Sequence, residues 1–316
     1  MTNTVNIGKG RRAANYLQRY WGLYAMLLLP LAFFFLFRYF PMVNLVLAFK
    51  QNTIFSPWDV PWAQNWGILP AMDNFRLAIE QPQFRLAFRN TIVFSLLDLV
   101  AGFPAPIILA LLLNELKFPK FKRVTQTISY MPHFLSWIII SGMAVRLFST
   151  NVGTINGILS NFGISAIPFL DSERHWVGSI VFLGVWKSIG WNTIIYLAAI
   201  TNVNPELYES AEMDGASRLR KIWHVTLPGI QPVIVILLIL AIGGIMGADF
   251  DRFLAMGNPL VERVSNVLPL YIWNWGLRTL QYAQATAVGL MQNTINFALL
   301  LSANFIVRRL GDEGLW

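Results

Sequence analysis

The chain has 316 residues, of which 55% are hydrophobic and only 13% are charged. This composition indicates a membrane protein rather than a soluble two-domain protein of the same length. The formal net charge is +8, but positive residues concentrate in cytoplasmic loops of membrane proteins, so the charge reports orientation and we expect no nucleic-acid partner. Cysteine is absent and the three histidines are isolated, which excludes disulfides and predicts no metal site.

Six apolar runs are long enough to cross a hydrocarbon core of about 30 Å, which requires about 20 residues per helix. The first run is too long for a cleavable signal peptide, so we expect it to be retained as a span. The second run contains Gly102, Pro104 and Pro106, which predict a kink. The expected spans cover about residues 24–40, with an extension to 49, then 90–113, 127–148, 177–200, 232–248 and 285–307.

Basic residues in the short loops set the expected orientation. Four of them lie within residues 117–123, after the second span, and Arg308 and Arg309 follow the sixth. The sequence therefore predicts an all-α polytopic membrane protein with six transmembrane helices and both termini in the cytoplasm. One membrane domain, residues 21–310, is expected between a basic N-terminal segment, 1–20, and a short tail, 311–316.

The longer segments between spans are then expected outside the membrane. Within the first of them, residues 73–89 are expected to form an amphipathic helix at the outer surface. Six tryptophans of the outer segments suit an aromatic belt at the membrane interface: Trp58, Trp62, Trp66, Trp176, Trp273 and Trp275.

Asp98 and Lys187 are charged residues well inside the apolar runs, where a charge costs roughly 2.5 to 3.5 kcal/mol on insertion scales. Asp98 and Lys187 therefore require an explanation. Each either lines a transport pathway or has a structural role, with Asp98 paired to a neighbouring helix and Lys187 near the outer third of its span.

Amides and aromatic rings in the fourth and sixth spans raise a similar question. Sugars are bound by hydrogen-bonding amides and by flat rings that cover their C–H faces, so these side chains are candidates for a cavity lining. The alternative is that the polar ones join neighbouring helices. The candidates are Trp186, Trp191, Asn192 and Tyr196 on the fourth span, and Gln292 and Asn293, with Asn296, on the sixth.

Residues 204–228 form one polar, strongly capped segment between long apolar runs. Asn204 can cap a first helix, and Gly215 suits the left-handed position that ends it. Ser217 can cap a second short helix, which Pro228 is expected to stop. The orientation places this helix-turn-helix in the cytoplasm, where it is either a docking surface or a loop that merely connects two spans.

Motifs of enzymes are not found in the sequence. It has no G-x-x-x-x-G-K-[ST] phosphate loop, so the chain is not expected to bind ATP by a site of its own. It also has no G-x-S-x-G elbow and no H-E-x-x-H pair. We therefore expect no catalytic residues and no enzymatic activity.

The capped segment contains Glu209-Ser210-Ala211, then Asp214-Gly215-Ala216, and then Ile222 and Leu227-Pro228. This pattern resembles the EAA loop of type I ABC importer permeases, with Ser210 where alanine is usual. Over residues 21–310 the chain resembles the polysaccharide-type branch of the binding-protein-dependent sugar permeases. The motifs that carry this likeness are Asn74-Phe75, Phe88-Arg89-Asn90-Thr91, Phe103-Pro104-Ala105-Pro106-Ile107, Tyr130-Met131-Pro132-His133-Phe134 and Gly190-Trp191-Asn192.

The resemblance implies a permease subunit in a bacterial cytoplasmic (inner) membrane that forms half of a translocation pathway across the lipid bilayer. It implies a second permease subunit, two cytoplasmic ATP-binding cassette subunits that carry ATP and Mg, and an extracytoplasmic solute-binding protein. No cofactor is implied in this chain. The implied cargo is an oligosaccharide or polysaccharide fragment, with an acidic polymer such as alginate as one candidate. The residues implied to contact the ATPase are Glu209, Ser210, Ala211, Asp214, Gly215, Ala216, Leu227 and Pro228.

Two other functions remain open at this point. The chain could serve an ABC importer for a different solute, such as a polyol or peptide. It could instead be a secondary transporter coupled to an ion gradient, for which buried carboxylates and discontinuous helices are typical. Asp98 alone gives this second alternative little support.

Overall fold

The computed structural model describes residues 9–50, 72–311 and 314–315, and every regular element within them is a helix. Five helices of this part are long and apolar enough to cross a membrane, and a bent pair makes a sixth crossing when counted as one span. The prediction of an all-α protein with six spans is therefore confirmed.

Span 1 is longer than predicted. It comprises α1 (Lys9–Phe34), a π-helical turn η1 (Phe35–Tyr39) and a 3-10 segment η2 (Phe40–Phe49). The apolar window of this span is not buried by the rest of the chain. Its last part, η2, packs against α2 and α15, and the side-chain amide of Asn74 donates to the carbonyls of Ala48 and Lys50 there.

Span 2 is interrupted by a π-helical turn next to the residues that predict a kink. This turn, η3 (Asp98–Gly102), lies between α3 (Pro82–Leu97) and α4 (Pro104–Glu115). The amphipathic helix expected over residues 73–89 is shorter and is confirmed only as α2 (Asp73–Glu80). The residues that follow belong to span 2 because Pro82 begins a new helix, as proline favours at a first helical position.

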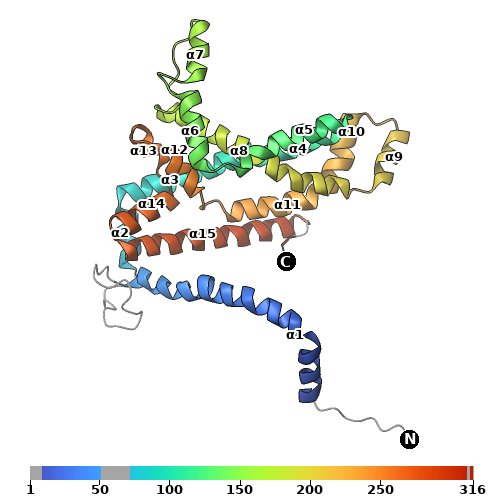
Figure 1. Cartoon of the computed structure of the whole chain (residues 1–316), viewed down its shortest axis with the longest axis horizontal. Coiled ribbons are helices and arrows are strands. Elements are labelled where there is room, and N and C mark those ends of the chain that lie inside the picture. The colour runs from blue at the N-terminus through green and yellow to red at the C-terminus, as the bar shows by residue number, and fades with distance from the viewer. Residues whose placement is uncertain (1–8, 51–71, 312–313, 316) are drawn as a thin grey trace.

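Span 3 is broken, which corrects the prediction of one helix over residues 127–148. A first part, α5 (Pro119–Tyr130) with the 3-10 turn η4 (Met131–Phe134), meets α6 (Trp137–Phe148) at 105°. The break follows Pro132, and Ser136 caps the new helix by accepting a hydrogen bond from the Ile139 amide at 3.4 Å. After α6 the chain forms α7 (Thr154–Asn161), which projects from the body in Figure 1.

Spans 4 and 5 are joined by the capped segment. Span 4 is the single helix α8 (Glu173–Thr201), and the segment contains α9 (Pro205–Met213) and α10 (Arg218–Lys221). Span 5 differs from the prediction at both ends, because the helix runs from α10 through a π turn, η5 (Ile222–Thr226), into α11 (Leu227–Gly243). Pro228 therefore does not stop the second helix. The wider π turn before it accommodates a ring that would clash with a regular α-helical turn.

The segment after span 5 returns to the membrane-spanning helices before span 6 begins. It contains α12 (Phe250–Met256), η6 (Pro259–Val261), α13 (Glu262–Ser265), α14 (Leu268–Trp273) and η7 (Asn274–Arg278). Span 6 is α15 (Tyr282–Arg309), which packs along α11. In Figure 1 the C-terminal end of α15 and the N-terminal end of α1 lie toward the same end of the molecule as α9 and α10, which agrees with the predicted orientation.

The largest core cluster joins α3, α6, α8 and α12, and Trp176 lies fully buried within it. The Trp176 indole donates to the carbonyl of Met256 at 3.0 Å. The assignment of Trp176 to an interfacial belt is therefore wrong, because its ring fills the core and its N–H is satisfied there. Trp58, Trp62 and Trp66 of the expected belt lie outside the described residues.

Candidate functional site

A polar cavity of about 420 Å³ lies among spans 2 to 5. Two of its residues, Asp98 and Lys187, stand near the midpoints of span 2 and α8. The cavity therefore lies about halfway along these spans, and Lys187 is near the middle of α8 rather than in the outer third of its span as expected. The polar side chains that line it are Ser95, Asp98, His133, Lys187, Ser188, Asn192, Asp249 and Arg252.

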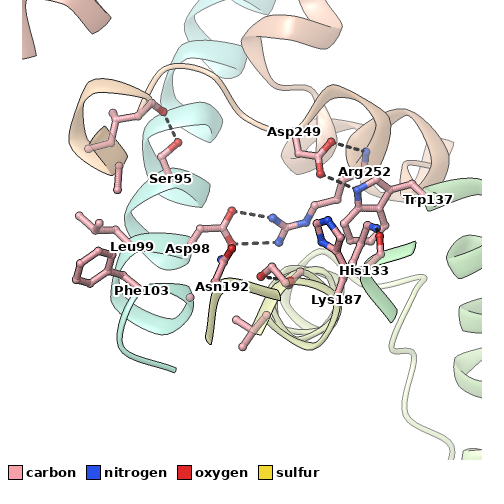
Figure 2. A pocket seen from close by; sticks show the side chains of 16 residues that line it. Ser95, Asp98, Leu99, Phe103, His133, Trp137, Lys187, Asn192, Asp249 and Arg252 are labelled. Atoms are coloured by element: carbon pink, nitrogen blue, oxygen red, sulfur yellow. Dashed lines mark hydrogen bonds and ion pairs between the residues drawn. The ribbon is translucent and has the colours of Figure 1, made fainter. Parts of the chain in front are cut away.

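A partly buried ion pair lines one side of the cavity (Figure 2). Arg252 of α12 is 3% exposed, and its Nη1 and Nη2 atoms lie 2.7 and 3.2 Å from the two carboxylate oxygens of Asp98. The same guanidinium donates to the carbonyl of Ile180 at 2.7 Å. Gly184 makes room for it, since a Cβ at that position would lie 2.8 Å from Arg252 Cζ. Asp98 is therefore paired with another helix, as one of the two sequence interpretations predicted.

Lys187 has a different environment from Arg252. Its ammonium donates to the carbonyls of His133 and Leu135 at 2.8 and 2.7 Å. These carbonyls lie at the break in span 3, where the end of a helix leaves acceptors unsatisfied and favours a cation. Among the described residues Lys187 forms no ion pair with a carboxylate. Its positive charge is thus held by neutral groups beside the cavity.

Asp249 also lines the cavity, but donors occupy both of its oxygens. Oδ1 accepts the Arg252 backbone amide at 3.4 Å as the N-cap of α12, and Oδ2 accepts the Trp137 indole N–H at 2.6 Å. Asp249 therefore serves to attach the start of α12 to α6.

The four candidates on span 4 do not share one location. Asn192 lines the cavity, whereas the Trp191 ring stacks on His133 at 4.5 Å with an interplanar angle of 3°. Trp186 packs against the largest core cluster, and Tyr196 is 2% exposed in a second cluster with Ile230. Only Asn192 of this group lies directly at the cavity.

The candidates on span 6 lie elsewhere. Gln292 and Asn293 line a separate, more apolar groove of about 570 Å³ along α14 and α15. The Gln292 amide also donates to the carbonyl of Met246 at 2.7 Å, and the Asn296 amide oxygen accepts the Met246 N–H at 2.9 Å. Gln292 and Asn296 therefore join span 6 to the end of span 5, as the interhelical interpretation predicted.

The capped segment has the local geometry expected from its sequence. The Asn204 side chain accepts the Glu206 amide at 3.1 Å, and the Ser217 hydroxyl accepts the Arg220 amide at 3.4 Å. Gly215 has φ +72°, the left-handed conformation that glycine adopts without a Cβ penalty. The Ala216 amide then closes the helix end on the carbonyl of Ala211 at 2.9 Å.

The capped segment exposes large apolar side chains as well as charged ones. Leu207, Met213, Leu219 and Trp223 are 50%, 89%, 69% and 66% exposed. A group of large apolar side chains left in solvent is typical of a protein contact surface. In the same segment, Lys221 of α10 pairs with Glu212 of α9, and this hydrogen bond and charge lower the pKa of the Glu212 carboxyl.

Comparison with known proteins assigns the family. A family model described as binding-protein-dependent transport system inner membrane component matches residues 84–312, more than half of the chain. The chain belongs to this family. It is therefore a multi-pass permease component of the inner membrane, and the expectation of a non-catalytic subunit is confirmed.

Related permeases cover nearly the whole chain. Protein LplB of Bacillus subtilis is 38% identical over 312 residues, which are 99% of this chain and 96% of that protein. The polygalacturonan/rhamnogalacturonan transport system permease protein YteP of the same organism is 38% identical over 93% of this chain and 90% of its own length. A crystal structure of a bacterial ABC transporter involved in the import of the acidic polysaccharide alginate matches with a TM-score of 0.84 and 36% identity, over 94% of this permease and 99% of that chain.

Sequence reasoning missed Arg252, Asp249 and His133 as cavity residues of this permease. Arg252 was assigned to an outer segment, although the unpaired charge of Asp98 required a basic partner somewhere. The run Gly243, Gly244 and Gly247 was a signal that span 5 ends early. A helix that ends before the outer surface brings the residues after it to membrane depth.

Proposed function

We propose that this permease forms half of the pathway through which an ATP-driven importer moves an oligosaccharide or polysaccharide fragment across the inner membrane. A second permease subunit would supply the other half, and two ATPase subunits would carry ATP and Mg. An extracytoplasmic solute-binding protein would deliver the cargo. The observation that carries the proposal is the polar mid-membrane cavity, in a chain whose relatives include named carbohydrate permeases.

The chemistry of the cavity suits a carbohydrate. Asn192 and Ser188 offer amide and hydroxyl groups to sugar hydroxyls, and the His133 ring, which stacks on Trp191 with one face, also lines the cavity. The Asp98 side chain is 39% exposed, so part of its carboxylate can still accept hydroxyl donors from the cargo. Of the sequence candidates, we retain Asn192 as a direct cargo contact. Trp191 would act through His133, while the roles of Trp186, Tyr196, Gln292 and Asn293 would be to pack and join the spans.

Lys187 favours an acidic cargo within this class. The charge of Arg252 is offset by Asp98, whereas within the described part of the chain Lys187 contacts neutral groups, two main-chain carbonyls and the Trp137 ring at 5.8 Å. An ammonium held in this way can attract the carboxylate of a uronate unit near the middle of the membrane. This chain is similar to crystal structures of an alginate importer, one of which is in complex with an alginate pentasaccharide-bound periplasmic protein. This likeness supports the proposal of an acidic cargo.

Energy would enter through the capped segment. We propose that α9 and α10 dock on an ATPase subunit through Glu209, Ser210, Ala211, Asp214, Gly215 and Ala216, with Leu227 and Pro228 at the start of α11. Closure of the ATPase dimer on ATP would then move the inner part of span 5, which continues directly from α10, and would change the access of the cavity. Asp98 was the residue that favoured an ion-coupled mechanism, and its carboxylate forms an ion pair with Arg252 instead.

The test is stimulation of ATP hydrolysis in the reconstituted complex with its binding protein, using neutral and acidic oligosaccharides of equal length. We expect a carbohydrate to stimulate hydrolysis, with acidic oligosaccharides more effective than neutral ones. In a Lys187→Met complex the response to acidic oligosaccharides should fall more than the response to neutral ones. An equal fall in the two responses would show that Lys187 only stabilises the break in span 3. A rate of ATP hydrolysis that no sugar changes would refute the carbohydrate proposal.

A further inference from the structure

Span 5 stops being helical at membrane depth. The α11 helix ends at Gly243 and α12 begins at Phe250, and the stretch between them, residues 244–249, is a turn followed by extended chain. Ile245 and Asp249 of this stretch line the central cavity. Non-helical backbone at this depth requires that its polar groups find partners within the protein.

Two amides of span 6 supply those partners at a single residue. Met246 is 1% exposed; its N–H donates to Asn296 Oδ1 at 2.9 Å, and its carbonyl accepts from Gln292 Nε2 at 2.7 Å. Gln292 and Asn296 are four residues apart on α15 and therefore share one face of it. The Ser95 hydroxyl of span 2 donates to the neighbouring carbonyl of Ile245, as Figure 2 shows. The backbone groups of Met246 and the carbonyl of Ile245 therefore have defined partners within the break.

The two sides of the break are attached to different parts of the protein. The inner side, Arg218–Gly243, is one continuous helix that begins in the capped cytoplasmic segment. The outer side, α12, is bonded to three other spans: Arg252 to Asp98, the Ala255 carbonyl to the Ser141 hydroxyl at 2.7 Å, and the Met256 carbonyl to the Trp176 indole. A displacement of the cytoplasmic segment would therefore move the inner side, while α12 stays with spans 2 to 4.

We propose that residues 244–249 are the hinge of span 5 in the transport cycle, and that Gln292 and Asn296 are positioning residues that hold this hinge through Met246. Gly244 and Gly247 lie within the hinge and supply the backbone freedom that such a joint requires. The inference rests on the proposed function only in that a partner ATPase drives the cytoplasmic segment. It does not depend on which solute is carried.

Distances between spin labels test the hinge directly, because the chain has no native cysteine. One label pair spans the hinge, at Leu240 of α11 and Leu254 of α12, both exposed in this chain. A control pair, Leu254 with Ile138 of α6, lies on the outer side alone. In the reconstituted complex we expect the hinge distance to differ between nucleotide-free and vanadate-trapped states while the control distance stays constant. A hinge distance that does not change, or a control distance that changes as much, would overturn the proposal.

Isosteric variants test the two positioning residues. Gln292→Met and Asn296→Leu remove the bonds to Met246 with little change in volume, and Thr294→Val is the matched control, since the Thr294 hydroxyl bonds the Leu290 carbonyl of its own helix. We expect uptake to fall about tenfold in the first two while basal ATP hydrolysis persists. Their hinge-distance distributions should broaden, and Asn296→Asp, which keeps the acceptor for Met246 N–H, should recover a narrow one.

Normal uptake and narrow distributions in both isosteric variants would refute the role of Gln292 and Asn296. These outcomes are separable from failure of the proposed function, because the distance measurement uses nucleotide states alone and requires no sugar. Loss of the assembled complex on size-exclusion chromatography in the isosteric variants, but not in Thr294→Val, would show a purely structural role and would also contradict the proposal.

Discussion

Replacing Asp98 by leucine should destabilise the permease by leaving a buried cation without its partner. Arg252 is 3% exposed, and of its partners among the described residues its guanidinium would keep the Ile180 carbonyl and the neighbouring rings of Trp137 and Phe253. Breaking a buried ion pair costs about 3 to 5 kcal/mol, and because the Asp98 side chain is 39% exposed we expect a loss near the lower limit, about 3 kcal/mol.

The second half of the prediction is partial recovery in the double variant Asp98→Leu/Arg252→Met. Removing both charges takes away the unpaired cation, and such replacements are often neutral or stabilising. At about 2 to 4 °C per kcal/mol, the single variant should unfold about 6 to 12 °C below the wild type, and the double variant should lie between the two. The assay is thermal unfolding of the purified complex in detergent. A single variant within 1 °C of the wild type, or a double variant less stable than the single one, would refute the reasoning.

Three further predictions concern backbone geometry and pH. Gly215→Ala and the control Gly163→Ala, in an outer loop, should each lower the free energy of unfolding by about 1–2 kcal/mol, because both glycines have positive φ and open space around them. Only the Gly215 variant should uncouple ATP hydrolysis from uptake. Gly190→Ala should prevent assembly of the complex, since its Cβ would lie 2.0 Å from the Ser129 carbonyl oxygen. The control Gly178→Ala, on the same helix, has free space for its Cβ and should assemble. Equal assembly of the two variants would contradict the close packing of α8 on α5. The lowered pKa of Glu212 means that its pairing with Lys221 stabilises the fold above the ordinary glutamate pKa and is lost as pH falls through the lowered value. Unfolding measured across that acidic range should show a pH dependence that Glu212→Gln reduces, and an unchanged profile would argue against the pair.

Local features were predictable from the sequence because a few adjacent residues determine them. The caps at Asn204 and Ser217 and the left-handed Gly215 follow from the preferences of side chains next to a helix end. The existence of the apolar spans was equally predictable. The requirement that a charge at Asp98 be paired or lie on a pathway was also sound, since hydrocarbon penalises an isolated charge.

Long-range pairing was not predictable in the same way. The partner of Asp98 lies 154 residues away, in a segment whose composition suggested the outer surface. The breaks in spans 3 and 5 were missed because apolar content continues through both, and only the short signals around Pro132 and Gly244 mark them. Gln292 could not be assigned between cargo and backbone until the break had placed the Met246 carbonyl beside it.

The central claim is tested most directly by uptake into proteoliposomes that contain the complete complex, with the binding protein and a labelled acidic oligosaccharide outside and ATP inside. Our account predicts accumulation that requires both ATP and the binding protein, and that is lost in the Gly215→Ala complex. Absence of accumulation for every oligosaccharide, or accumulation driven by a proton gradient without ATP, would contradict it.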